Sequence, residues 1–60
     1  MKVKKLISIL SEDTCYKIFD SDNPHNLIWF GRGNNYNNIV CKEDEILSIQ
    51  SSKKGLIIYI

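Results

Sequence analysis

Few side chains of this sequence have the type and spacing needed to do chemistry together. His25 is the only histidine, and it stands in a turn-like segment beside Pro24. The two cysteines, Cys15 and Cys41, have neither a metal-binding nor a redox spacing, and two ligands are too few for a structural zinc site. We therefore expect no catalytic residue, no metal site and no cofactor, and we predict that the chain is not an enzyme.

Acidic residues stand in three groups that could supply paired carboxylates for acid–base chemistry or cation binding. Their spacing does not match a calcium-binding loop, because the required glycine and the terminal glutamate are missing. We therefore expect solvated charges beside the ends of strands. The groups are Glu12-Asp13, Asp20 with Asp22, and Glu43-Asp44-Glu45.

One short segment combines residue types that recur at binding surfaces. Gly31-Arg32-Gly33 has the glycine spacing of a phosphate-binding turn, but the third glycine and the long following helix are missing. Arg32 lies between the aromatic pair Trp29-Phe30 and Tyr36, and Arg, Trp and Tyr are enriched at binding hot spots. The segment therefore indicates either a contact surface or an ordinary loop with two flexible positions.

Length and charge limit the class of protein. The 60 residues form one small domain, 1–60, and chains of this size often gain stability by oligomerising. The net charge is only +1, whereas nucleic-acid-binding proteins carry a large positive charge. A nucleic-acid-binding module that uses surface lysines and aromatic residues is the alternative to a protein-binding role. Its lysines would be Lys2, Lys4, Lys5, Lys53 and Lys54.

The first ten residues show the apolar stripe of an amphipathic helix. Four apolar side chains recur at positions i, i+3, i+4 and i+7, and lysines take the other side. Ile9 lies off this stripe and alternates with Ile7, so a strand is the competing interpretation. We predict a helix over residues 2–10. The stripe consists of Val3, Leu6, Ile7 and Leu10.

Four segments rich in β-branched and aromatic residues are typical of strands. A turn around Pro24 joins the first two, and a five-residue loop ending in Gly55 joins the last two. Between these pairs, Tyr36, Ile39 and Val40 have helical spacing, which predicts a short helical turn after an Asn N-cap. The predicted strands cover residues 14–20, 27–30, 46–50 and 55–60.

These elements predict an α+β domain. The N-terminal helix packs on a four-stranded antiparallel sheet made of two hairpins, with the short helical turn between strands two and three. Alternation along the strands directs Tyr16 and Ile18 inward in the first strand, and Leu47 and Ile49 inward in the third.

The predicted strands carry more apolar surface than one short helix can cover. Cys15, Phe19 and Ile46 fall on the face away from the helix, together with either Leu27/Trp29 or Ile28/Phe30. A contiguous apolar patch of this kind usually marks an interface. We therefore predict that this face binds a second copy of the chain, as a homodimer, or a host protein. The apolar anchors would be Phe19, Trp29, Ile57 and Tyr59, with Arg32 and Tyr36 at the polar rim.

The N-terminal stretch MKVKKLISIL has lysines before apolar residues, as a signal peptide does. Ser8 interrupts its apolar run, and Glu12-Asp13 follows without a cleavage site of small residues. No segment approaches the roughly 18 continuous apolar residues of a membrane span. We expect a cytoplasmic protein with no membrane partner, in which both cysteines are free thiols that behave as small buried apolar groups.

Most of the chain resembles a group of short phage proteins. The motifs are V-K-K-L-I-S-I-L at 3–10, Y-K-I-F-D at 16–20 and E-I-L-S-I-Q-S-S-K-K-G-L-I-I-Y-I at 45–60. They are similar to small accessory proteins of phages and prophages of low-GC Gram-positive bacteria, whereas the connection 31–45 departs from that pattern. The resemblance implies a non-enzymatic protein that binds and inhibits a host component, such as a defence protein.

Overall fold

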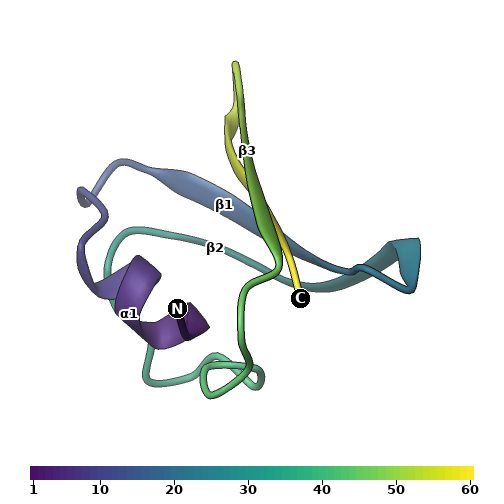
Figure 1. Cartoon of the computed structure of the whole chain (residues 1–60). Coiled ribbons are helices and arrows are strands. Elements are labelled where there is room, and N and C mark those ends of the chain that lie inside the picture. The colour runs from purple at the N-terminus through teal and green to yellow at the C-terminus, as the bar shows by residue number, and fades with distance from the viewer.

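The computed structural model describes residues 1–60 and shows one short helix beside a four-stranded sheet (Figure 1). The predicted α+β class and the N-terminal helix are confirmed. The strand order in the sheet is β2-β1-β4-β3. The elements are α1 (Val3–Ser8), β1 (Cys15–Asp20), β2 (Asn23–Arg32), β3 (Ser48–Ser52) and β4 (Gly55–Tyr59).

The helix α1 packs its apolar stripe on the sheet. Val3 and Ile7 are fully buried and Leu6 nearly so, and Leu10, just beyond the helix, also packs against the core. The helix is shorter than predicted because it ends in a 3₁₀-type turn. In this turn the N–H of Ile9 donates to the carbonyl of Leu6, three residues earlier, at 3.2 Å. Packing of the stripe on the core therefore stabilises the helix, and the competing interpretation as a strand is wrong.

The N-terminus of α1 is capped by the backbone of a distant segment. Lys2 occupies the N-cap position and makes no side-chain capping bond. Instead, the N–H of Val3 donates to the carbonyl of Asp44, and the N–H of Lys4 to the carbonyl of Lys42, both at 2.9 Å. The first N–H groups of a helix have no partner within it, so these two bonds attach the connection between β2 and β3 to α1.

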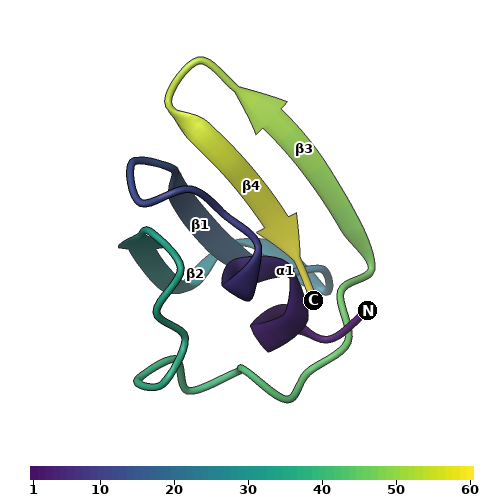
Figure 2. The same ribbon diagram turned by 90° about the vertical axis from the view of Figure 1, so that its left-hand side faces the viewer.

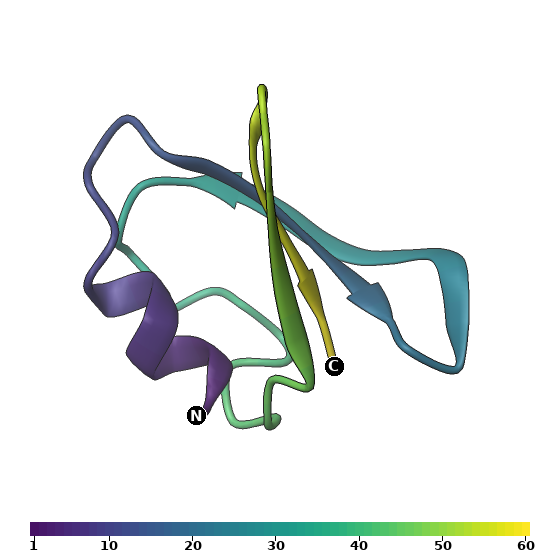
Figure 3. The ribbon, with the colours of Figure 1, turned by 45° about the horizontal axis from the view of Figure 1, so that its top comes forward.

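The hairpin of β1 and β2 has a much tighter turn than predicted. Only Ser21 and Asp22 lie between the strands, because residues 23–26 already belong to β2. The carboxylate of Asp20 accepts a hydrogen bond from the N–H of Asp22 at 2.9 Å, which stabilises the turn. This end of the hairpin projects away from α1 (Figure 3), and residues 23–26 are exposed there.

The hairpin of β3 and β4 also has a two-residue turn, in place of the predicted five-residue loop. Lys53 and Lys54 form the turn, and Ser52 pairs with Gly55 across it. The hydroxyl of Ser52 donates to the carbonyl of Gly55 at 3.0 Å. Gly55 has a φ of 130°, a conformation that favours glycine.

The two hairpins meet through a parallel pair, so the prediction of a fully antiparallel sheet is wrong. β1 and β4 run in parallel, with residues 16–19 beside 56–59. β2 ends beside the start of β1, whereas β3 begins beside the end of β4. The connection from β2 to β3 must therefore run the length of the sheet and cross between its edges (Figure 2), as parallel pairing requires.

The connection 33–47 contains isolated turns, and the predicted helical turn between strands two and three is wrong. The N–H of Ile39 donates to the carbonyl of Tyr36 at 3.1 Å, and that of Asp44 to Cys41 at 3.0 Å, without a continuous helix. The side chain of Asn35 accepts the N–H of Asn37 at 3.1 Å. Asparagine side chains that bind nearby N–H groups favour turns over helix, which explains the difference.

The core lies between one face of the sheet and a cover made of α1 and the connection 33–47. We call this face the inner face. Ile18 and Ile58 are neighbours in the parallel pair, and both are fully buried at its centre. The inward positions predicted for Tyr16 and Ile18 are confirmed. The buried apolar side chains are Val3, Leu6, Ile7, Tyr16, Ile18, Ile39, Cys41 and Ile58.

The third strand differs from its prediction. Leu47 and Ile49 were expected to be buried, but they are 70% and 44% exposed. Ile49 does pair with Ile58 and shares the inner face, but β3 is an edge strand that the cover does not reach. Ile46, expected on the opposite face, packs against the core instead, because its N–H donates to the carbonyl of Met1 at 2.8 Å and holds it beside α1.

Replacing Gly55 with alanine should destabilise the fold strongly. A Cβ at this position would overlap the carbonyl oxygen of Cys15 in β1, and a φ of 130° strains any residue with a Cβ. We expect the free energy of unfolding to fall by about 2 kcal/mol or more in urea denaturation. The control is Lys54→Ala in the same turn, which should change the stability by about 0.5 kcal/mol at most. Equal stability of Gly55→Ala and the wild type would contradict this.

Candidate functional site

No helix or connection covers the face of the sheet opposite α1 (Figures 1 and 3). We call it the outer face. Phe30 is 68% exposed and Leu27 is 42% exposed on β2, and the parallel register places side chains of β1 and β4 beside them. The apolar patch predicted from the sequence is therefore present. The outer face consists of Cys15, Lys17, Phe19, Leu27, Phe30, Ile57 and Tyr59.

Two aromatic rings of this face cover each other. Phe19 and Tyr59 are register partners on β1 and β4, and their ring centroids are 5.9 Å apart with a tilt of 31°. Such a pair stabilises the fold by about 0.5 to 1.5 kcal/mol beyond simple burial, and both residues are half-buried. Phe30 has no ring partner of this kind, so it is the aromatic side chain of the outer face most open to contact.

An irregularity in β2 decides which of its side chains reach the outer face. Ile18 pairs with Trp29, but the next residue, Phe19, pairs with Leu27, so one residue of β2 is left over. Both Ile28 and Trp29 then pack against the core. Neither alternating pair expected from the sequence holds, because Leu27 and Phe30 reach the outer face together.

A hollow of about 510 Å³ opens on the outer face where β1 and β4 begin, beside the place where the β3–β4 hairpin turns away from β1 and β2 (Figure 1). Phe30, Leu56 and Ile57 supply its apolar lining. Its charged lining consists of Lys17, Arg32 and Lys54, and no carboxylate lines it. The hollow thus combines an apolar floor with charges of one sign.

The charges around the hollow differ in whether they have partners. Arg32 donates a hydrogen bond to the carboxylate of Asp13 at 3.0 Å, between two exposed side chains. Lys17 and Lys54 take part in no ion pair. These two ammonium groups are therefore the cations of the hollow that remain available to a ligand.

The structure brings together four of the six residues predicted for the interface. Phe19, Ile57 and Tyr59 lie on the outer face, and Arg32 lies at the hollow. Trp29 and Tyr36 lie elsewhere, packed against the core. The sequence offered Leu27 and Phe30 only in alternative pairs, and it gave no signal that Lys54 lies close to Lys17. An irregular pairing and a parallel register bring these residues together.

The two cysteines have different surroundings, and both are free thiols. Cys15 is exposed in the lining of the hollow, so the expectation that it is buried is wrong. Cys41 is buried as expected. Burial raises the pKa of the Cys41 thiol, and the nearby charge of Asp44 raises it further.

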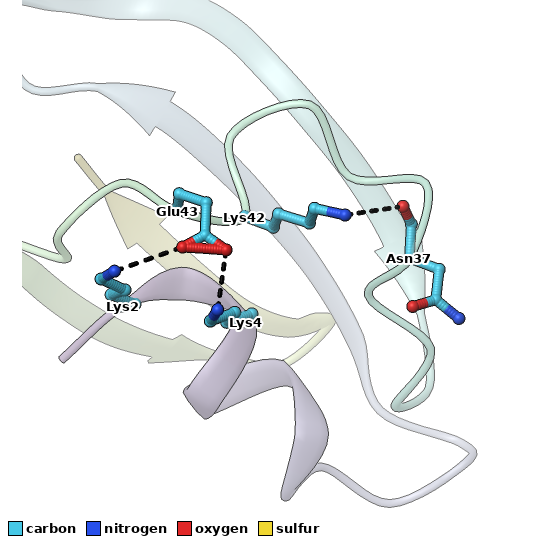
Figure 4. Close-up of polar contacts among 5 residues, drawn as sticks. All are labelled: Lys2, Lys4, Asn37, Lys42 and Glu43. Carbon is cyan, nitrogen blue, oxygen red and sulfur yellow. Dashed lines mark hydrogen bonds and ion pairs between the residues drawn. The ribbon is translucent and has the colours of Figure 1, made fainter.

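Most lysines near the N-terminus are engaged by carboxylates (Figure 4). Glu43 accepts hydrogen bonds from Lys4 at 2.7 Å and from Lys2 at 3.2 Å, and Glu45 accepts one from the N-terminal ammonium at 2.9 Å. Hydrogen bonds from Lys4 and Lys2 lower the pKa of Glu43, and the bond to Glu43 raises the pKa of Lys4. These lysines therefore do not join Lys54 in a free basic patch.

Carboxylates gather at the other end of the sheet. A shallow hollow of about 410 Å³ is lined there by Asp20, Asp22, Asp44 and Glu45, with apolar side chains that include Leu47 and Ile60. No three His, Cys, Asp or Glu side chains of the chain are grouped so that they could hold a metal ion. The charged side chains that line the two hollows thus have opposite signs.

Comparison with known proteins finds no matching family model, no matching curated protein and no matching solved structure. No helix of the chain is long and apolar enough to cross a membrane.

Replacing Glu43 with glutamine should lower the stability at pH 7. A carboxylate whose pKa is lowered by folding stabilises the fold above its ordinary pKa of 4.5, and this contribution is lost as the pH falls through the lower pKa of the folded state. We expect a small decrease in Tm at pH 7 that disappears as the pH falls below the lowered pKa of Glu43 and shrinks at high salt. The control is Glu12→Gln, which removes an unpaired glutamate. A Tm difference that is independent of pH would refute this role.

The two thiols should react at very different rates in the native protein. Cys15 is exposed, whereas Cys41 is buried and has a raised pKa, so less of it is in the reactive thiolate form. Iodoacetamide at pH 8 should modify Cys15 first, as mapped by mass spectrometry of peptides. Both thiols should react alike in urea, and equal rates without urea would mean that Cys41 is not protected.

Proposed function

We propose that this chain is a non-enzymatic protein-binding module that docks on a partner protein through its outer face. The observation that supports this most strongly is Phe30, which is 68% exposed beside Leu27 on a sheet face without cover. A large apolar side chain left in water forgoes roughly 1.5 to 3 kcal/mol, in a domain whose core supplies roughly 3 to 5 kcal/mol. A partner that covers the face recovers this energy.

The proposed partner is a host protein. This part of the proposal comes from the resemblance to phage accessory proteins, and it implies that the chain acts in a bacterial cytoplasm against a component such as a defence protein. The mechanism would be steric: the outer face covers a surface that the host protein needs, without any cofactor. A sheet face suits this role, because its backbone hydrogen bonds hold the contact residues in a fixed arrangement.

The sequence also predicts that the outer face could form a homodimer. Two outer faces packed together would cover Phe30 in both copies. They would also bring together two surfaces whose free charges, Lys17 and Lys54, are all positive, and like charges at an interface oppose association. We therefore propose a host protein as the main partner, with self-association as an outcome to be measured.

A nucleic-acid-binding module is the second candidate, because Lys17 and Lys54 lie near an exposed ring. Stacking on single-stranded nucleic acid uses several open rings along a basic groove. Here Phe19 and Tyr59 cover each other, and Lys2 and Lys4 are engaged by Glu43. The aliphatic side chains of the outer face also match a protein surface better than a phosphate backbone.

Replacing Phe30 with aspartate should abolish partner binding. The immobilised chain is exposed to a lysate of a low-GC Gram-positive bacterium, and retained proteins are quantified by mass spectrometry. Loss of a central anchor costs about 2 kcal/mol or more at a hot spot, which corresponds to about 30-fold weaker binding. The partner should be retained by the wild type and lost from Phe30→Asp.

The matched control is Val40→Asp, because Val40 is 76% exposed but lies in the connection 33–47, away from the outer face. It should retain the partner as well as the wild type does. Circular dichroism confirms that both variants fold, and sedimentation velocity on the same proteins measures self-association. Retention that is equal for Phe30→Asp and Val40→Asp would eliminate the outer face as the docking surface.

A further inference from the structure

We propose that the hollow at the start of β1 and β4 binds an acidic, apolar segment of the partner protein, in which Glu or Asp side chains flank a Leu or Phe. This inference rests on the proposed function and names the chemistry that the outer face recognises. It identifies the hollow as the part of the outer face that determines specificity, and Lys17 and Lys54 as the residues that select the partner.

The shape and lining of the hollow match one large apolar side chain with its neighbours. Its volume of about 510 Å³ lies within the range of ligand sites in proteins, roughly 300 to 1,000 Å³. Phe30 and Ile57 provide the apolar contact on the outer face. Such a lining gives affinity for a Leu or Phe side chain but does not discriminate among apolar partners, so specificity must come from the charges.

The charges at the hollow are complementary to carboxylates. Lys17 comes from β1, Arg32 from the end of β2 and Lys54 from the β3–β4 turn, and the fold brings these three together without any lining carboxylate. Lys17 and Lys54 have no carboxylate partner within the chain, whereas Lys2 and Lys4 are paired with Glu43. Bonds between ammonium and carboxylate groups strengthen as an apolar contact excludes water, and this favours an acidic segment.

Other occupants fit the observations less well. A second copy that packs its outer face on this one would bring the lysines of the two copies together, and these like charges would repel each other. A second copy could instead offer its own acidic end, with Asp22, Asp44 and Leu47, but that surface is itself hollowed and not a projecting segment. A nucleic acid would supply negative charge without the aliphatic side chain that the floor of the hollow receives.

The test uses Cys15 as a reporter, because its thiol lines the hollow. Two probes are compared: a pool of capped octapeptides made of Leu, Phe and Glu, and the same pool with Lys in place of Glu. Alkylation of Cys15 by iodoacetamide, a neutral reagent, is followed by mass spectrometry. The Glu pool should slow alkylation by about fivefold when it is present at about four times its Kd. The Lys pool should leave the rate unchanged.

Charge variants identify the residues responsible. Lys17→Gln/Lys54→Gln should abolish protection by the Glu pool, each rate being compared with that of the same variant without peptide. Lys5→Gln, which removes an exposed and unpaired lysine of α1, should keep full protection. Because all three lysines are solvent-facing, circular dichroism should show the wild-type fold in both variants.

Each other outcome overturns the inference. Equal protection by both pools would mean that the hollow selects for apolar character alone, and protection by neither would mean that it does not bind such segments. Protection by oligo(dT) but not by the Glu pool would assign the hollow to nucleic acid. Protection that rises with protein concentration alone would assign it to a second copy. If the Glu pool fails while Phe30→Asp still loses the lysate partner, only the proposed chemistry is wrong and the docking function stands.

Discussion

β4 is the last strand of the sequence, yet it occupies the middle of the sheet in parallel with β1, and both faces of the sheet depend on this pairing. On the inner face it places Ile58 beside Ile18, the two side chains at the centre of the core. On the outer face the same register places Tyr59 beside Phe19. A shift of one residue would exchange the faces and destroy the core and the contact surface together.

The parallel pair also explains why only one face is covered. It obliges the connection 33–47 to travel the length of the sheet, and the connection does so on the side of α1, where Ile39 and Cys41 enter the core. The connection in turn caps α1 through the carbonyls of Lys42 and Asp44. Helix and connection therefore form one cover on the inner face, and none of the described elements lies on the outer face.

Local patterns in the sequence predicted the helix and the first strand, but not the tight turns or the exposure of the third strand. The helical stripe predicted α1, and alternation in β1 predicted that Tyr16 and Ile18 are buried. Strand order could not be predicted, because the pattern of β4 is equally compatible with an antiparallel neighbour. The irregular pairing at Ile28 left no signal either, and it placed Ile28 against the core and Leu27 on the outer face. The outer face was thus predictable as an apolar excess, but its hollow was not.

An uncovered apolar face tends to pair with a second copy of itself. The charges around the hollow oppose this pairing, and they also contribute to recognition of a partner. Lys17 stands on the outer face between apolar neighbours, as charged residues do on natural sheets that resist aggregation. At the free edge, β3 presents Ser48 and Gln50 on the same face. A partner without a carboxylate would bury Lys17 unpaired, and the free-energy cost of this burial would weaken its binding. In the proposed docking, the lysine that opposes pairing between two outer faces is therefore also the one that favours an acidic partner.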